Sequence, residues 1–346
     1  MRCPTLADLP PPPSGKTGWP WTEECSRLPE LRPDGTTWPR ISIVTPSYNQ
    51  GQFLEETIRS ILLQGYPDLE YIIIDGYSVD DSAAITDKYA TWLSHWESEK
   101  DDGQAHAINK GLKRATGAIF QWINSDDRLT PHALKNVALL FDESSTIAGH
   151  VNHFGGERTF LSGNLNLTAL TLLHHAAPYN LKRLFALTNY DQPGVWLSTK
   201  IIKEVGGFDE SKNYIFDLSA TVFYLRVAQK ILYTNQILVE FRHHAQSKTE
   251  SVPELFYQEH TNFLHQLANE RIYGLSKHAR RILLAIEFEN SAGDIFNLEK
   301  KRVDRLRHLA RMIREFPKMR SARFYLGALK NIIFQAQVKH NQYEIR

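Results

Sequence analysis

The feature that most constrains this chain is an alternation of short apolar runs with amphipathic stretches, which begins at residue 40. Three runs have the length and β-branched composition of buried strands: ISIVT (41–45), LEYIIID (69–75) and GAIFQWIN (117–124). The stretches between them place apolar residues at helical spacing: QFLEETIRSILLQ (52–64) and GQAHAINKGLKRA (103–115). This order predicts an α/β fold with a mostly parallel sheet, whose ligands bind beyond the carboxyl ends of the strands.

Composition divides the chain into a leader, a main domain and an extension. Nine of the sixteen prolines fall within the first 40 residues, which disfavours helix there. After residue 141 the pattern is less regular and predicts mixed strands, and from about residue 252 it is mostly helical. We expect three parts: a Pro/Trp-rich leader (1–39), a domain with two halves (40–141 and 142–250) and a helical, basic extension (251–346).

Charge and cysteine content limit the classes of function. The 40 Lys and Arg residues nearly balance the 39 Asp and Glu residues, so the whole-chain charge does not favour a nucleic acid partner. The only cysteines, Cys3 and Cys25, predict neither a disulfide framework nor a thiolate metal site, and they suit a reducing compartment. No apolar run approaches the roughly 18–20 residues that span a bilayer. These features predict a cytoplasmic protein, neither exported nor integral to a membrane.

Two adjacent carboxylates, Asp126 and Asp127, follow the third predicted strand. Helix capping is one explanation, but Thr130 as N-cap and Pro131 supply a better helix start nearby. Successive side chains of an extended loop point to opposite sides, so the pair is better placed to divide two tasks than to chelate one ion together. One carboxylate, with waters and a ligand's phosphates, suits Mg²⁺ or Mn²⁺. Two interpretations of the pair therefore remain equally open: a metal site, or ordinary acidic residues at the end of a strand.

Other acids follow the predicted strands. Asp75 ends the second strand, where a carboxylate can accept hydrogen bonds from a base or a ribose. Asp80, Asp81, Asp101 and Asp102 have a simpler interpretation as turn residues and helix caps. Of this group, Asp75 is the strongest candidate for ligand binding.

Separated motifs, in order, resemble the family-2 glycosyltransferases of the GT-A fold across about residues 39–250. They are PRISIVTPSYNQGQFLEETIRSILLQGYPDLEYIIIDG (39–76), SEKDDGQAHAINKGLKRATGAIFQWINSDD (98–127) and QPGVWLSTKIIKEVGGFDE (192–210). The leader sequence GKTGWPW (15–21) is similar to bacterial members that act on surface polysaccharides. The resemblance implies a Rossmann-like sheet flanked by helices and a nucleotide-sugar-dependent transferase, usually metal-assisted and inverting.

The resemblance also implies roles for individual residues. The residues implied to bind the nucleotide sugar are Thr45, Pro46, Tyr48, Asp75, Asp101, Asn109, Lys110 and Asp126. Asp127 resembles the metal ligand of the acidic motif. In FRHHAQSKT, the spacing of Arg242, His244 and Ser247 is similar to a family pattern whose histidine approaches the metal or diphosphate. His243 fits this role less well, and a surface-loop histidine remains an alternative for His244.

Two departures from the family pattern bear on the mechanism. Where the family usually has DGGSTD, this chain reads DGYSVD, so Tyr77 is strained if its position needs a positive φ. The family's base is an acid six residues before an arginine, whereas Asp217 lies nine residues before Arg226. Three residues shift a helical side chain by ~60° and ~4.5 Å. We favour Asp217 as the base, with the acids of GGFDE, Asp209 and Glu210, as alternatives.

The function implied by the resemblance is sugar transfer from a nucleotide-diphosphate sugar to a glycan or lipid-linked acceptor, with Mn²⁺ or Mg²⁺. Two rival hypotheses are a nucleotide-sugar-binding protein without catalysis and a metal-dependent phosphoryl-transfer enzyme. The second rival lacks the glycine-lysine loop of the P-loop enzymes. The stretch KKRVDRLRHLARMIREF (300–316) predicts a basic amphipathic helix. Such a helix either contacts an anionic membrane surface or packs on the protein with a solvated basic face.

Overall fold

The computed structural model describes residues 1–142, 145–156, 159–174, 189–248, 252–270, 272, 274–296, 301–315, 325–326, 328–330 and 332. Contacts divide the chain into two compact units. The first contains Met1–Ala176 with Phe185–His260, and the second contains Ala177–Leu184 with Thr261–Arg346. Most of the predicted basic extension after residue 315 lies outside the described residues.

Nine strands of the described chain form one sheet in the first unit, in the order β3-β2-β1-β4-β8-β6-β9-β5, with β7 paired to β6. Four are mutually parallel: β3 (His95–Ser98), β2 (Leu69–Asp75), β1 (Ile41–Ser47) and β4 (Ile119–Trp122). The alternating pattern predicted three of them, and β3 is an additional strand at the edge of the sheet. The others are β8 (Val195–Ser198), β6 (Ser145–Phe154), β7 (Phe160–Gly163), β9 (Lys230–Arg242) and β5 (Arg128–Leu129). β8 pairs antiparallel with β4, so the second half completes the same sheet with mixed strands.

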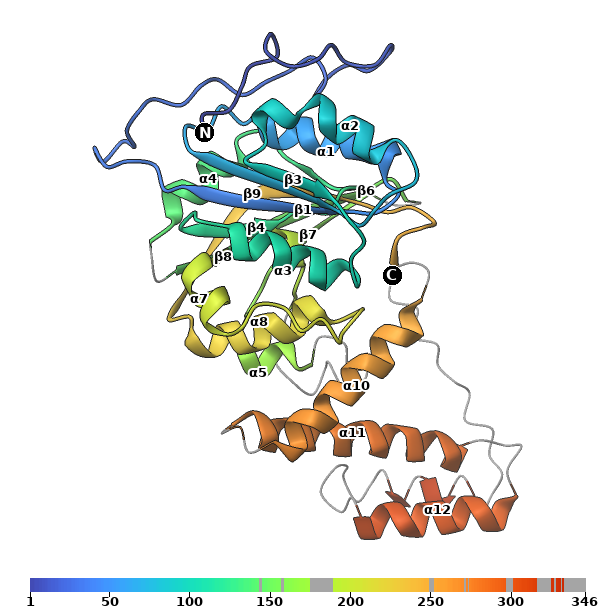
Figure 1. Cartoon of the computed structure of the whole chain (residues 1–346). Coiled ribbons are helices and arrows are strands. Elements are labelled where there is room, and N and C mark those ends of the chain that lie inside the picture. Colours follow the sequence, from blue (N-terminus) through green and yellow to red (C-terminus); the bar gives the residue numbers. More distant parts are fainter. Residues whose placement is uncertain are drawn as a thin grey trace. The chain divides into compact units, whose positions relative to one another are not determined.

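Helices cover both faces of this sheet (Figure 1). Figure 1 shows α1 (Gly51–Leu62) and α2 (Ser82–Lys88) on one face and α3 (Gln104–Arg114) on the other. The remaining helical segments of the first unit are η1 (Ala90–Trp92), α4 (Ala133–Leu140), α5 (Ala169–Leu172), η2 (Gln192–Gly194), α7 (Thr199–Glu204) and α8 (Phe216–Val227). The predicted α/β fold is confirmed.

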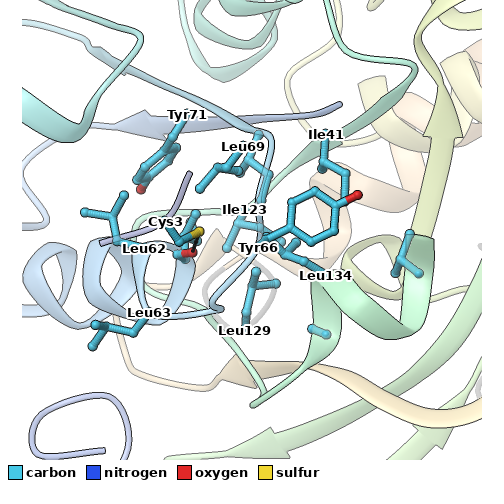
Figure 2. Packing of buried hydrophobic residues seen from close by; sticks show 14 of the residues in the cluster. Cys3, Ile41, Leu62, Leu63, Tyr66, Leu69, Tyr71, Ile123, Leu129 and Leu134 are labelled. Carbon is cyan, nitrogen blue, oxygen red and sulfur yellow. Dashed lines mark hydrogen bonds between the residues drawn. The ribbon is translucent and has the colours of Figure 1, made fainter. Parts of the chain in front are cut away.

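The apolar face of α1 forms the core against β1 and β2. Leu54, Ile58 and Ile61 recur at helical spacing and are fully buried with Ile41 and Tyr71 of the strands. Figure 2 shows part of this cluster, with Leu62 of α1 near Cys3 of the leader and Tyr71 of β2. Each fully buried side chain of this kind contributes about 1.5–3 kcal/mol to folding. The core therefore holds the carboxyl ends of the parallel strands in place.

The Pro-rich leader packs on the first unit around Arg59 of α1. The Arg59 side chain is fully buried and donates to the backbone carbonyls of Pro10, Pro20 and Trp21 at 2.8, 3.1 and 3.0 Å. It also donates to the hydroxyl of Tyr89 at 3.2 Å. A guanidinium suits this environment because its five donors diverge in a fixed plane. One buried cation thus binds two separate stretches of the leader to α1, in addition to backbone hydrogen bonds such as that from Cys25 to Leu63.

The start of α4 differs from the sequence prediction. The N-cap residue is His132, in the left-handed region at φ 64°, and the helix begins at Ala133. Thr130 instead pairs with β9, because its N–H donates to the carbonyl of Leu238 at 3.1 Å and its hydroxyl to that of Ile237 at 2.5 Å. Pairing with a distant strand therefore displaces the helix start that the local sequence favoured.

Three helices account for most of the described residues after 252: α10 (Pro253–Asn269), α11 (Leu275–Phe296) and α12 (Arg302–Glu315). In the second unit, Leu309 and Met312 of α12 are buried with Phe288 and Ile295 of α11. Among the described helices, none combines the length and hydropathy needed to cross a membrane.

Candidate active site

The carboxyl ends of the parallel strands border a cavity of about 1000 Å³ within the first unit. This volume is at the upper end of the roughly 300–1000 Å³ range of pockets that hold a drug-sized ligand. Residues that follow the ends of three parallel strands contribute to its wall: Pro46, Tyr48, Gly76, Asn124, Ser125 and Asp126. The cavity therefore lies where the order of the predicted strands places a ligand.

Asp126 faces this cavity beside His244. Its Oδ2 lies 2.9 Å from Nε2 of His244, whose ring packs on Phe53 with centroids 4.8 Å apart. The carbonyl of Asp126 accepts from Nε of Arg242 at 2.9 Å. Arg242 also pairs with Glu56 of α1 at 2.8 Å. The loop after β4 is thus fixed by the chain that follows β9.

Asp127 is buried and is not among the residues that line the cavity. Its Oδ1 accepts from the backbone N–H of Arg242 at 2.9 Å, and its Oδ2 accepts from Nδ2 of Asn124 at 3.2 Å. Burial raises the pKa of the Asp127 carboxyl well above its usual range, and the neighbouring Asp126 charge raises it further. The loop is a turn and not the extended segment that the prediction assumed, because the N–H of Asp127 donates to the carbonyl of Asn124 at 3.1 Å. Asp126, however, is the one presented to the cavity, which departs from the metal-ligand role predicted for Asp127.

Three other predicted donor-binding residues line the cavity: Pro46, Tyr48 and Asp101. Tyr48 is exposed, and Asp101 accepts from the N–H of Gly103 at 2.9 Å. Gly76 allows this close approach, because an added Cβ there would lie 2.8 Å from Oδ2 of Asp101. The loop after β2 therefore needs glycine at this position to bring Asp101 to the cavity.

Thr45 and Asp75 are buried and do not belong to the described cavity wall. Thr45 Oγ1 lies 3.1 Å from the hydroxyl of Tyr71. Asp75 accepts from the N–H of Ser78 at 2.9 Å and from its hydroxyl at 2.5 Å, and from the hydroxyl of Ser98 at 2.7 Å. Both residues therefore organise the strand ends instead of facing a ligand in this structure.

Asn109 and Lys110 of α3 are also outside that wall. Asn109 donates to the carbonyl of Phe208 at 2.7 Å and accepts from its N–H at 3.0 Å. Lys110 pairs with Glu97 at 2.5 Å, and this contact helps to lower the pKa of the Glu97 carboxyl to about 2 despite burial, which acts in the opposite direction. These contacts join α3 to the loop before α8 and to β3.

Asp217 lies in the first turn of α8 and lines the cavity. Burial raises the pKa of its carboxyl to about 6, against the opposing effects of backbone N–H groups and the Lys248 charge. Of the two alternatives, Asp209 binds Ser211 and Lys212, and Glu210 accepts from Asn109 at 2.7 Å. Neither belongs to the described wall of the cavity.

Tyr77 adopts the positive φ that the departure from the family pattern suggested, at 65°. Its side chain is 65% exposed and is outside the described cavity wall. A β-carbon in the left-handed region costs about 1 kcal/mol or more. The loop after β2 keeps its glycine-type backbone although the residue there is tyrosine.

Several cavity residues were not singled out from the sequence: Lys100, His153, Asp191 and Lys248. Lys100 and Lys248 adjoin quoted motif residues, and that adjacency was the available signal. Burial lowers the pKa of Lys248, against the opposing charges of Glu259, Asp101 and Asp217. Asp191 likewise directly precedes the motif at 192–210, whereas His153 lies in a part of the chain that none of the family motifs includes.

Comparison with known proteins decides the family. Residues 42–205 match the family described as Glycosyl transferase family 2. These residues form a glycosyltransferase domain of family 2. The predicted family and the predicted enzyme class, a glycosyltransferase, are confirmed. The site residues of this glycosyltransferase domain remain predictions.

Curated relatives of the glycosyltransferase domain carry the same class name. An uncharacterized glycosyltransferase of Rickettsia typhi is 25% identical over 232 residues, which are 63% of this chain and 68% of the relative. One of Mycobacterium tuberculosis is 27% identical over 176 residues, 50% of this chain and 64% of the relative. The putative teichuronic acid biosynthesis glycosyltransferase TuaG of Bacillus subtilis is 37% identical over 97 residues, 27% of this chain and 38% of the relative. The chain thus spans about two thirds of the first two relatives.

Solved structures show that the glycosyltransferase domain has the GT-A fold. S. aureus TarS 1-349 in complex with UDP-GlcNAc superposes with a TM-score of 0.56 at 18% identity, covering 80% of this chain and 81% of that one. The mannosyltransferase PcManGT from Pyrobaculum calidifontis, in complex with GDP-Man and Mn²⁺, gives a TM-score of 0.52 at 17% identity, covering 90% of this chain and 84% of that one. The predicted fold class is confirmed by this likeness.

Proposed function

We propose that this glycosyltransferase moves a sugar from a nucleotide-diphosphate sugar to a hydroxyl of a glycan or lipid-linked acceptor in polysaccharide biosynthesis. The observation that carries the proposal is that Asp126 and Asp217 line one cavity at the carboxyl ends of the parallel strands. The names of the relatives point the same way: TarS was solved with UDP-GlcNAc and PcManGT with GDP-Man, and TuaG is named for teichuronic acid biosynthesis.

Asp126 and His244 are the residues that fit a metal ion. Their facing atoms, a carboxylate oxygen and an imidazole nitrogen 2.9 Å apart, are ordinary ligands of divalent cations. No group of three or more His, Cys, Asp or Glu side chains is arranged for a metal among the described residues, so oxygens of the donor's diphosphate would complete the coordination. The imidazole favours Mn²⁺ over Mg²⁺, which takes oxygen ligands. When bound, the cation would stabilise negative charge on the leaving diphosphate.

Asp127 then supports the metal site instead of binding the ion. Its carboxylate fixes the backbone of Arg242, and Arg242 in turn fixes the carbonyl of Asp126. In this proposal Thr45, Asp75, Asn109 and Lys110 support the donor side indirectly. Pro46, Tyr48 and Asp101, which line the cavity, are the residues proposed to contact the nucleotide sugar.

Asp217 is the proposed general base. A carboxyl group with a pKa of about 6 is mostly ionised at neutral pH and still basic enough to accept a proton. The acceptor oxygen forms a bond to the anomeric carbon, the bond from that carbon to the diphosphate breaks, and the hydroxyl proton passes to Asp217. A single in-line displacement of this kind inverts the anomeric configuration.

The proposal is tested with a panel of nucleotide sugars, with and without Mn²⁺, by thermal shift and by release of the nucleoside diphosphate. We expect stabilisation by one donor class that depends on metal, and transfer when a suitable acceptor is present. Binding without any release of nucleoside diphosphate would favour the rival nucleotide-sugar-binding function.

A membrane contact through α12 is part of the proposal. Val303, Leu306 and Ile313 are exposed on this helix, and Arg307 lies between them in the sequence. Exposed apolar groups bordered by arginines suit an anionic membrane surface on the cytoplasmic side. Flotation with anionic and neutral liposomes tests this: binding only to anionic vesicles, lost on Leu306→Glu, is expected. Equal recovery with both vesicles would contradict it.

A further inference from the structure

One wall of the cavity carries linked polar side chains that have no role in the proposed donor or metal site. His153 of β6, Asp191 before η2 and His243 after β9 line the cavity. Nδ1 of His153 lies 2.9 Å from Nε2 of His243, and its Nε2 lies 2.9 Å from Oγ of Ser162 and 3.5 Å from Oδ2 of Asp191. Ser162 of β7 donates to the same Oδ2. We call these four residues the His153 cluster.

The surrounding structure holds the His153 cluster in one arrangement. Oδ1 of Asn164 accepts from the N–H of Asp191 at 2.8 Å, and Nδ2 of Asn164 donates to the carbonyl of Asp191 at 3.0 Å. The ring of His153 stacks on Phe160 with centroids 4.2 Å and planes 6° apart, and Phe241 packs against it at 5.3 Å. Polar groups fixed in this way are preorganised to bind a ligand.

The cluster adjoins the proposed base. Tyr190 precedes Asp191 and lines the cavity, and its hydroxyl lies 3.0 Å from Oγ1 of Thr221 on α8, the helix that carries Asp217. Burial raises the pKa of Tyr190, and the charges of Asp217 and Asp191 raise it further. Both carboxylates therefore lie within electrostatic reach of one phenol. The cluster and Asp217 line the same cavity, and Tyr190 links the segment of Asp191 to the helix of Asp217.

The chemistry of this wall suits a sugar ring. Tyr190, Tyr214, Phe216, Phe241 and Phe256 contribute aromatic faces to the cavity, against which the apolar face of a pyranose packs. Carboxylate and imidazole groups accept from and donate to hydroxyls. Within the cluster the Asp191 carboxylate repels a ligand that is itself acidic, although the cavity wall also contains Lys100 and Lys248. These properties favour a neutral, hydroxyl-rich ligand.

We propose that the His153 cluster is the acceptor subsite, and that it binds a neutral saccharide through its hydroxyls and presents one of them to Asp217. This inference rests on the proposed function, because it requires a transferase in which Asp217 is the base. The cavity of about 1000 Å³ leaves room for such a ligand beside a nucleotide sugar.

Saturation-transfer NMR on the full chain, with diamagnetic Mg²⁺ in place of paramagnetic Mn²⁺, tests the subsite. The probes are a nucleotide-sugar panel, neutral hexoses, N-acetylhexosamines and their disaccharides, with glucuronic acid and a hexose 1-phosphate as acidic comparisons. Asp191→Asn removes the carboxylate charge from the cluster. His243→Ala removes an imidazole and leaves Asp191, whose backbone Asn164 binds, unchanged. Asp87→Asn, at an exposed position of α2, is the matched control. Circular dichroism and thermal unfolding verify that each variant folds.

We expect neutral saccharides to bind the wild type and Asp87→Asn, and to bind Asp191→Asn and His243→Ala at least about 10-fold more weakly. Nucleotide-sugar binding should be equal in all four proteins. Undiminished saccharide binding by both folded cluster variants would overturn the subsite. So would binding of acidic saccharides alone, or no saccharide binding by a wild type that binds nucleotide sugar. Absence of nucleotide-sugar binding by the wild type refutes the proposed function instead, and with it the acceptor role. The saccharide comparison then decides only whether the His153 cluster binds a neutral saccharide.

Discussion

The Oδ2 atom of Asp126 lies 2.9 Å from Nε2 of His244, although 118 positions separate the two residues in the sequence. This contact joins the loop after β4 to the chain after β9 at the edge of the cavity. It also distinguishes Asp126 from its neighbour, because the Asp127 carboxylate accepts instead from the backbone N–H of Arg242 and from Asn124. The position of the proposed metal site follows from this relationship.

Asp126→Asn is expected to weaken Mn²⁺-dependent binding of the nucleotide sugar by at least about 10-fold, because the cation loses a charged ligand. Asp127→Asn, the matched control one residue later, should retain metal-dependent binding, since an amide oxygen still accepts from the N–H of Arg242. Isothermal titration calorimetry of both variants with and without Mn²⁺ provides the measurement. If Asp127→Asn weakened Mn²⁺-dependent binding more than Asp126→Asn, Asp127 would be the metal ligand.

Asp217→Asn is expected to lower transfer by roughly 10²- to 10⁴-fold while donor binding stays unchanged. In the wild type, kcat/KM should rise with pH through about 6 and then level off, because the ionised carboxylate is the active form and its pKa is raised to about 6. The residual activity of the variant should lack this rise. A wild-type profile that is flat from pH 5 to pH 8 would exclude Asp217 as the base.

The same substitution should stabilise the fold at high pH. The pKa of Asp217 is raised from 3.8 to about 6, so the stability that its protonated form contributes is present below about pH 4 and is lost as pH rises through about 6. At pH 8 Asp217→Asn should therefore exceed the wild type by up to about 3 kcal/mol in free energy of unfolding. At pH 4 the difference should nearly vanish. Urea unfolding at both pH values measures it, and an equal difference at both would contradict the assigned cause.

Arg59→Met should destabilise the protein by at least about 3 kcal/mol, because it leaves three leader carbonyls without their donor. Arg27→Met, in the leader but exposed and paired with Asp8 at 3.6 Å, should cost less than about 1 kcal/mol. Both values come from urea unfolding. Similar losses for the two variants would show that the leader is not held by the buried cation.

Tyr77→Gly is expected to raise the free energy of unfolding by about 1 kcal/mol, because glycine adopts a φ of 65° without steric cost. Tyr77→Ala keeps the β-carbon and should give little or no gain. Thermal and urea unfolding of the two variants decide the comparison. An equal increase in the free energy of unfolding for Tyr77→Gly and Tyr77→Ala would show that the effect comes from removal of the tyrosine ring and not from the backbone.

Local patterns were sufficient for the main elements of the donor half, although they did not predict β3 or α2. The run 69–75 coincides with β2, the stretch 52–64 overlaps α1, and the stretch 103–115 contains α3, because apolar spacing reports directly which face of an element is buried. The same local reasoning failed at Thr130, where pairing with β9 displaced the start of α4. It also did not reveal His153 or Asp191, which meet only because β6, β7 and the segment before η2 converge.

The sequence by itself therefore determined the alternation of strands and helices, the edge of the sheet at which acids gather, and the glycosyltransferase family. Tertiary structure alone decided that Asp126 faces the cavity, that Asp217 and not Asp209 or Glu210 lines it, and that the leader packs around Arg59. The physical reason is that periodicity depends on neighbours three or four residues apart, whereas a side chain's partners come from any part of the chain that folding brings within hydrogen-bonding distance.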